Sequence, residues 1–148
     1  MKTVKELLNA KGYAVWSITP DATVFNALTE MAQKEVGALT VMERGQLVGI
    51  ISERDYARKV ILKGKTSRTT LVREIMTSRV ICVAPEQTVE ECMALLTGRR
   101  IRHLPVIEHN QVIGIISIGD LVKSIISEQQ FIIEQLEHYI TGTYHHNQ

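Results

Sequence analysis

The chain contains one sequence pattern twice, and this internal repeat limits its fold more than any other feature. Residues 15–60 align with residues 80–125 without a gap, at an offset of 65 positions. The identical pairs fall on expected helix caps, strands and turns: Pro20/Pro85, Thr23/Thr88, Val24/Val89, Leu39/Leu104, Val41/Val106, Gln46/Gln111, Gly49/Gly114, Ser52/Ser117 and Asp55/Asp120. One copy of about 60 residues would bury too little surface to be stable by itself. We therefore expect two copies that pack against each other through their sheets.

Each copy predicts the order strand, helix, strand, strand, helix. In the first copy we expect a helix from 4 to about 9, a strand at 15–18, a helix from 24, strands at 38–43 and 46–51, and a helix after 52. The fold class is α+β: two β-α-β-β-α repeats related by a pseudo-two-fold axis, plus a long C-terminal helix. The expected divisions are a first repeat at 4–64, a linker at 65–70, a second repeat at 71–127 and a C-terminal helical extension at 128–141.

The two copies share a Ser-x-x-Asp corner, Ser52 to Asp55 and Ser117 to Asp120. In each, a short apolar strand ends on the Ser and an amphipathic run follows, which is typical of a strand leading into a capped helix. A helix N-terminus attracts phosphate. A pseudo-two-fold axis would place both corners in one central cleft, a natural ligand site. The alternative is that the corners only cap helices, and the two roles can coexist.

Composition excludes several classes of function. The formal net charge of the 148 residues is +1, which argues against broad binding to nucleic acid or acidic membranes. No apolar run approaches the roughly 20 residues that span a bilayer. Cys82 and Cys92 lie at apolar positions without metal-ligand spacing, so reduced thiols in the cytoplasm are favoured, and no signal peptide is visible. No catalytic Ser/Cys–His–acid set, metal cluster or P-loop is visible, so we expect no enzyme, no catalytic residue and no metal site.

The repeat resembles a pair of CBS domains, also called a Bateman module. The resemblance rests on the two corners, on residues 101–106 and 72–77, and on their common register, and it runs from about Val4 to Ile126. It implies a stand-alone, non-enzymatic sensor of adenosine-containing ligands such as AMP, ADP, ATP, NAD or S-adenosyl methionine, with no obligatory cofactor. The ligand would shift the arrangement of the repeats, and an unidentified regulated protein would respond. The alternative is an interaction module whose ligand sites are empty.

The resemblance also implies roles for individual residues. Asp55 and Asp120 would hold ribose hydroxyls, while Ser52 and Ser117 would meet phosphate. Residues near the first and second strands of each repeat would frame the base: Trp16, Val36, Gly37, Ala38, Ile81, Ile101, Arg102 and His103. The chemistry agrees, since a carboxylate is a pure acceptor that suits a vicinal diol. For His103 a structural role, and for Trp16 a place in the core or cleft wall, stay open.

The two corners differ in charge. The first contains Arg54, which suits phosphate, with Arg58 one turn further on; the second has Ile118 and Gly119 instead. Gly119 would let a ligand or backbone approach closely. We therefore expect two inequivalent sites, although Arg54, Arg58 and Lys59 could equally form a solvated helix face.

The C-terminal apolar pattern continues from Leu121 to Ile140, past the end of its repeat. A helix of this length is roughly 30 Å long. Its apolar residues beyond Gln130 need a partner, because small domains rarely leave such a stripe exposed. A symmetric homodimer, with the C-terminal helices packed on each other or on the neighbouring module, is favoured over packing back onto the same chain.

Overall fold

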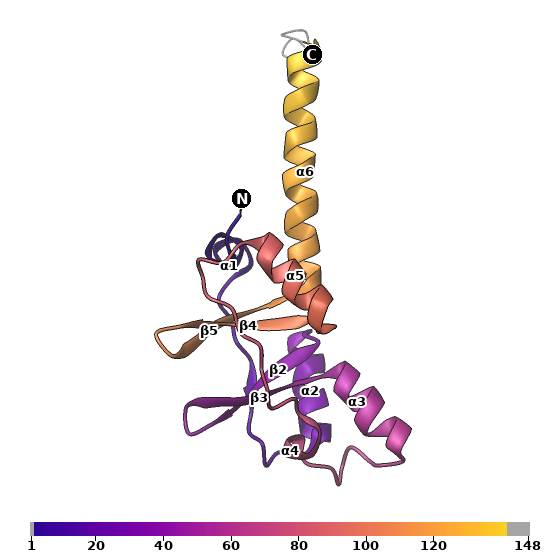
Figure 1. The fold of residues 1–148 in the computed structure, drawn as a ribbon. Helices are drawn as coiled ribbons and strands as arrows, with labels where there is room; N and C mark the ends of the chain where they lie inside the picture. Colours follow the sequence, from indigo (N-terminus) through magenta and orange to yellow (C-terminus); the bar gives the residue numbers. More distant parts are fainter. Residues whose placement is uncertain (1, 142–148) are drawn as a thin grey trace.

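The computed structural model describes residues 2–141 and consists of two stacked halves with one helix projecting from them (Figure 1). The elements are α1 (Val4–Lys11), β1 (Ser17–Ile18), α2 (Val24–Lys34), β2 (Ala38–Glu43), β3 (Gln46–Ser52), α3 (Glu53–Lys59), a 3-10 turn (Ile61–Lys63), α4 (Val72–Ile75), α5 (Val89–Arg99), β4 (His103–Glu108), β5 (Gln111–Ser117) and α6 (Ile118–Thr141). The sheets have the orders β1-β2-β3 and β4-β5. The expected α+β fold is confirmed.

The pseudo-two-fold relation extends to details of the backbone. Both hairpins are antiparallel, and both shift register at equivalent points, between Val41 and Met42 and between Val106 and Ile107. Glu35 and Arg100, which end α2 and α5, both adopt the left-handed conformation, with φ of 56° and 54°. Equivalent residues therefore repeat their backbone geometry as well as their sequence.

The first strand is the least symmetric element. Thr40 N–H donates to Trp16 O at 3.2 Å in the first half, where β1 pairs with β2 in parallel. Pro105 stands at the position equivalent to Thr40, and a proline has no N–H to donate to Ile81. The second half therefore keeps only an isolated parallel bridge, between Val83 and Val106, in place of the expected strand.

The short helices α1 and α4 exchange halves. α1 contributes Val4, Leu7 and Leu8 to the core of the second half, and α4 contributes Val72 and Ile75 to that of the first. The contacts are close at two equivalent glycines. A Cβ on Gly49 would lie 2.6 Å from Met76 Sδ, and one on Gly114 would lie 2.8 Å from Leu8 Cδ2.

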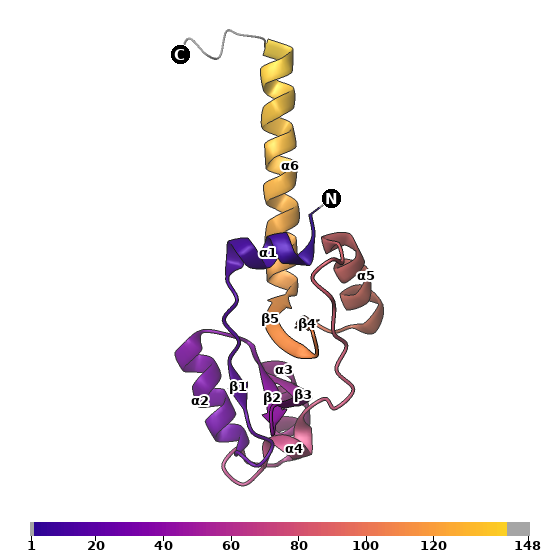
Figure 2. The same ribbon diagram turned by 90° about the vertical axis from the view of Figure 1, so that its left-hand side faces the viewer.

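Each half therefore contains a helix from the other repeat: α1 of the first repeat packs in the second half, and α4 of the second repeat packs in the first half. This exchange holds the two halves together. Figure 2 shows α1 lying across the base of α6, far from the rest of the first repeat. Because each core contains residues of both repeats, neither repeat has to bury its apolar surface by itself.

α6 leaves the body after two turns. Leu121 and Ser124 are buried against the second half, whereas every residue from Gln129 to Ile140 is exposed. Figures 1 and 2 show this part of the helix standing clear of all other elements. Among the residues described, no helix combines the length and apolar character needed to cross a bilayer.

Candidate functional site

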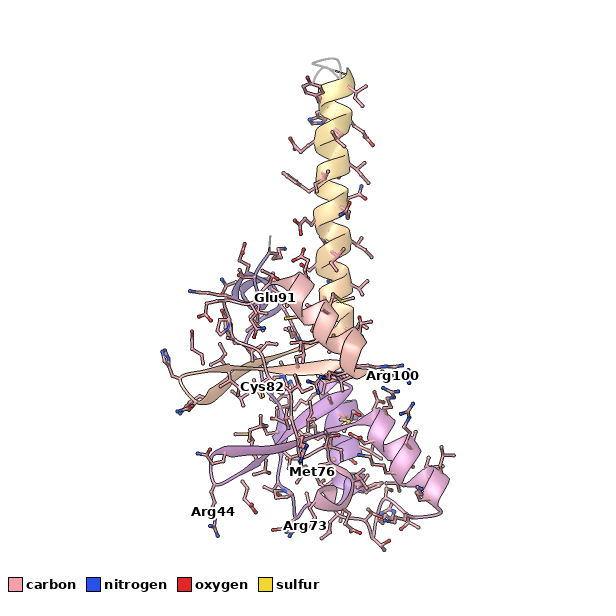
Figure 3. All side chains as sticks on the ribbon, in the orientation of Figure 1. Arg44, Arg73, Met76, Cys82, Glu91 and Arg100 are labelled. Atoms are coloured by element: carbon pink, nitrogen blue, oxygen red, sulfur yellow. The ribbon has the colours of Figure 1, made fainter. Side chains whose placement is uncertain are left out.

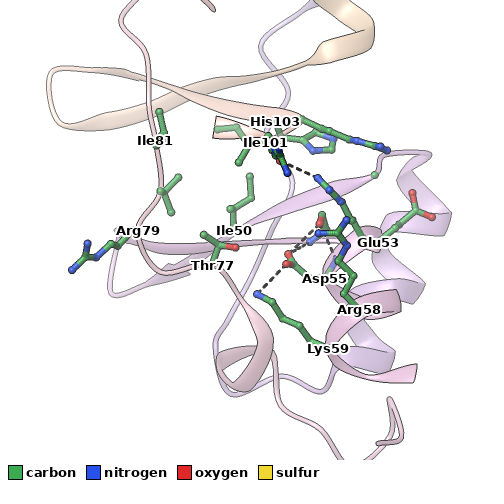
Figure 4. A pocket seen from close by; sticks show the side chains of 16 residues that line it. Ile50, Glu53, Asp55, Arg58, Lys59, Thr77, Arg79, Ile81, Ile101 and His103 are labelled. Atoms are coloured by element: carbon green, nitrogen blue, oxygen red, sulfur yellow. Dashed lines mark hydrogen bonds and ion pairs between the residues drawn. The ribbon is translucent and has the colours of Figure 1, made fainter. Parts of the chain in front are cut away.

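A cavity of about 360 Å³ lies between the two halves, beside the first corner (Figure 4). One wall is formed by the end of β3 and by α3, through Ser52, Asp55 and Arg58. The facing wall comes from the second repeat, through the segment 100–103 that precedes and starts β4. The site therefore depends on how the two halves are held together.

The first corner forms a complete capping box. Ser52 Oγ accepts from Asp55 N–H at 3.2 Å, and Asp55 Oδ2 accepts from Ser52 N–H at 2.9 Å. Asp55 Oδ1 lies 3.2 Å from Lys59 Nζ, which also donates to Ile75 O at 2.9 Å. The carboxylate is thus fixed in position by the helix that it caps, and it lines the cavity.

Positive charge dominates the lining of this cavity. The cationic residues are Arg54, Arg58, Lys59, Arg79, Arg100 and Arg102, against the acidic residues Glu53 and Asp55. Arg54 Nη1 donates to Arg100 O at 2.9 Å, which links α3 to the second half across the opening. Arg79 lies on the far side of the cavity from Arg58 (Figure 4). Such a lining suits an anion, and arginine is well adapted to phosphate.

The cavity also has an apolar part. Ile50, Ile81 and Ile101 line it, and Ile50 exchanges backbone hydrogen bonds of 3.0 and 2.9 Å with Thr77. Apolar side chains next to fixed polar groups are typical of small-molecule sites, since the apolar surface accepts a ring while the polar groups orient it.

His103, the first residue of β4, lines the cavity. Burial lowers the pKa of His103 below its ordinary value, and the charge of Lys11 lowers it further, against smaller opposing effects of Asp120 and Asp55. The imidazole is therefore neutral at neutral pH and can both donate and accept a hydrogen bond. A Cβ on Gly37 would lie 3.6 Å from His103 Nε2, so the backbone of the first half passes close to this ring.

The second corner has a different arrangement. Asp120 Oδ2 accepts from Ser117 N–H at 2.8 Å, as in the first corner, but also from Lys11 Nζ at 2.5 Å. Lys11 Nζ donates as well to Ile115 O at 2.6 Å. Burial raises the pKa of Asp120, but the hydrogen bonds from Lys11 and Ser117 outweigh it and hold the pKa below its ordinary value. The carboxylate of this corner is thus already paired with a lysine of the same chain.

The family comparison agrees with this geometry. The model of the CBS domain matches residues 4–62 and 72–127. This chain belongs to the CBS-domain family. Because the model matches both repeats, the duplicated fold is that of a CBS pair. One relative is an enzyme, the inosine-5′-monophosphate dehydrogenase of Methanocaldococcus jannaschii, but the similarity covers only 21% of that protein. In residues 2–141 no three His, Cys, Asp or Glu side chains gather as a metal site would require.

Known CBS proteins resemble the chain over most of its length. The mitochondrial CBS domain-containing protein CBSX3 of Arabidopsis thaliana is 41% identical, over 96% of this chain and 73% of that protein. A solved candidate signal-transduction protein with CBS domains from Burkholderia ambifaria is 47% identical, with a TM-score of 0.84 over 86% of this chain and 96% of that one.

A more distant CBS pair has been solved in complex with 5′-methylthioadenosine and S-adenosyl-L-methionine. It is 22% identical, with a TM-score of 0.77 over 86% of this chain and 98% of that one. At this identity the likeness concerns the fold alone.

The CBS pair brings together only part of the residue set expected from the sequence. Eight of these residues line the cavity: Gly37, Ser52, Arg54, Asp55, Ile81, Ile101, Arg102 and His103. Six do not: Trp16, Val36, Ala38, Ser117, Gly119 and Asp120. Under the offset of 65, Trp16 and 36–38 correspond to Ile81 and 101–103, which face the first corner from the second repeat.

Sequence reasoning missed six residues that line the cavity: Ile50, Glu53, Thr77, Arg79, Val80 and Arg100. The signal for Arg79 was available, because the first helices of the repeats align at an offset of 68 and this offset pairs Arg79 with Lys11. Arg79 lines the cavity of the first corner, and Lys11, at the equivalent position, forms an ion pair with Asp120 in the second corner.

Proposed function

We propose that this CBS pair is a regulatory module that binds an adenosine-containing, phosphate-bearing ligand in the cavity of the first corner. The observation that carries the proposal is the ratio of six cationic to two acidic side chains around a cavity of about 360 Å³ with an apolar part. Arg54, Arg58 and Arg102 would hold phosphate, Asp55 the ribose hydroxyls, and Ile81 and Ile101 the base.

The cavity volume favours a mononucleotide such as AMP or ATP over NAD, because it lies near the lower end of the usual range for ligand pockets, about 300 to 1,000 Å³. Lys11 on Asp120 makes the second corner a poor site in this arrangement of the halves. We therefore propose one occupied site per chain, with no obligatory cofactor.

Signalling would follow from the position of the site between the halves. A ligand that touches α3 and the 100–103 segment together stabilises the arrangement that brings them close, and only its differential affinity can shift the equilibrium. The bond from Arg54 to Arg100 O is a contact that such a ligand would reinforce or replace. An unidentified regulated protein would bind one of the two arrangements.

Titration calorimetry of the full chain with AMP, ATP, NAD and S-adenosyl methionine tests the proposal, after extraction and analysis of any co-purified nucleotide. Asp55→Asn should weaken binding about tenfold, since a hydrogen bond to a charged group contributes about 1.5–3 kcal/mol, whereas Asp120→Asn should leave the affinity unchanged. If none of the four ligands gives a binding signal and no nucleotide co-purifies, the alternative function, an interaction module, is favoured.

The homodimer and the cytoplasmic location also belong to this proposal. Both cysteines are free, and burial, followed by the charge of Glu91, raises the pKa of Cys92 to about 11, which makes this thiol unreactive. Unreactive free thiols suit a reducing compartment. The mitochondrial Arabidopsis relative is a family member from an organelle, so fractionation of the source cells is the direct test of the location.

A further inference from the structure

Among residues 2–141, the outer part of α6 has no neighbour that would cover its apolar residues. Side chains project from it on every side (Figure 3), and Ile133 and Leu136 are 47% and 55% exposed. The helix from Gln129 to Ile140 therefore carries an apolar surface that no other element of the described residues covers, and such a surface is typical of an interface.

Five apolar residues of α6, together with Gln129, follow a heptad pattern. The residues spaced alternately by four and three positions are Val122, Ile126, Gln129, Ile133, Leu136 and Ile140. This alternation is the seam of a coiled coil, with Ile126, Ile133 and Ile140 at position a and Val122, Gln129 and Leu136 at position d. We call these six residues the α6 seam.

A second apolar row flanks the α6 seam on one side. Ile125, Ile132 and Tyr139 occupy the heptad position g, whereas the e positions on the other side hold Lys123, Gln130 and Glu137. Ile125 also packs against the core of the second half, so this row continues an apolar surface of the body.

We propose that the α6 seam binds the α6 seam of a second copy of this chain in antiparallel orientation. In a parallel pair, g residues face e residues of the partner, which would place Ile125 and Ile132 against polar side chains. In an antiparallel pair, g faces g and e faces e. The apolar g residues of one chain then pack against the apolar g residues of the second chain, and the polar e residues face the polar e residues.

One register satisfies the whole α6 seam. Val122 faces Ile140 of the second copy, Ile126 faces Leu136, and Gln129 faces Ile133. In the same register Lys123 faces Glu137, a pair of opposite charges, and Ile132 faces its own copy on the two-fold axis. This self-complementarity is what a closed two-fold interface requires, and it identifies a second copy rather than an unrelated protein as the occupant.

The oligomeric state of the full chain tests the interface. Ile133→Glu should halve the mass measured by light scattering, because it places a charge in the α6 seam. Phe131→Glu is the matched control, since Phe131 is 61% exposed but lies on the opposite face of the helix. It should leave the dimer intact. A monomeric wild-type chain, or equal loss of mass in both variants, would overturn the proposal.

Disulfide trapping tests the orientation. In a Cys82→Ser background, the variants Gln129→Cys and Ile133→Cys are mixed, exchanged under reducing conditions and oxidised. An antiparallel seam yields the cross-link between positions 129 and 133, identified by peptide mass. Cross-links of each variant with itself alone would show a parallel seam and overturn the proposal.

This inference deepens the homodimer proposed above but is independent of the nucleotide. Titration of AMP or ATP into Ile133→Glu distinguishes failure of the two proposals, because a monomeric variant that binds nucleotide normally retains the site while it lacks the interface.

Discussion

Lys11 Nζ lies 2.5 Å from Asp120 Oδ2, although the two residues are 109 positions apart in the chain. The ion pair ties the end of α1 to the first turn of α6, so it fastens the N-terminal segment to the second half. It also explains why the two corners, nearly identical in sequence, present different surfaces. Asp55 pairs with Lys59 of its own helix and both line the cavity, whereas Asp120 pairs with Lys11 of a distant helix.

We expect Lys11→Met to open the second corner. The variant loses the ion pair but keeps the aliphatic stem, so the fold should lose less than about 1 kcal/mol, as for other partly exposed pairs. Calorimetric titration with the nucleotide that binds the wild type should then give two ligands per chain instead of one. Lys5→Met, on the same helix, serves as the control and should still bind one ligand per chain. If Lys11→Met also binds only one, this account of the second corner is contradicted.

The same ion pair gives the stability a defined pH dependence. The pKa of Asp120 is lowered in the folded chain, so its contribution is complete at neutral pH and is lost as the pH falls through the lowered folded pKa, which lies below the ordinary value of 3.8. Denaturant unfolding of the wild type and Asp120→Asn should therefore differ at pH 7 and converge toward pH 3. If the difference between their free energies of unfolding grows as the pH falls, the stabilising role of the Asp120 carboxylate is contradicted.

The close contact at Gly49 predicts a large asymmetry between glycine substitutions. A Cβ at Gly49 would lie 2.6 Å from Met76 Sδ and 3.0 Å from Thr77 O. Gly49→Ala should cost about 1–3 kcal/mol, as expected for overpacking. Gly98→Ala is the matched control, because that helical position has no atom within 4 Å of the new Cβ. It should stabilise α5 by up to about 1 kcal/mol. Urea unfolding of both variants measures the difference.

The sequence predicted most of the fold because the duplication constrains local structure. The β2 bounds agree with the expectation, and the Ser52 to Asp55 corner is the predicted capped helix start. The shortened first strand of the second repeat was also readable, since it follows from the missing N–H of Pro105.

The parts that escaped prediction depend on long-range packing. The exchange of α1 and α4 between halves cannot be read from periodicity, because an amphipathic helix has the same pattern whichever core it joins. The closure of the second corner by Lys11 follows from that exchange. The sequence difference at the corners, Arg54 against Gly119, predicts two inequivalent ligand sites. It did not reveal that Lys11 pairs with Asp120.

His103 provides a reporter of ligand binding in solution. Its pKa is lowered chiefly by burial, so the free protein should show a titration midpoint below the ordinary 6.5. A phosphate bound beside the ring favours the imidazolium and should raise this pKa. By linkage, binding then takes up protons, and the nucleotide affinity increases as the pH falls from the raised midpoint toward the lower one.

Proton NMR of the imidazole Hε1 signals, with and without saturating AMP or ATP, measures both midpoints. His109, in the exposed turn between β4 and β5, is the internal control and should not respond to nucleotide. A His103 midpoint that stays constant while calorimetry reports binding would place the ligand away from this cavity and contradict the proposed site.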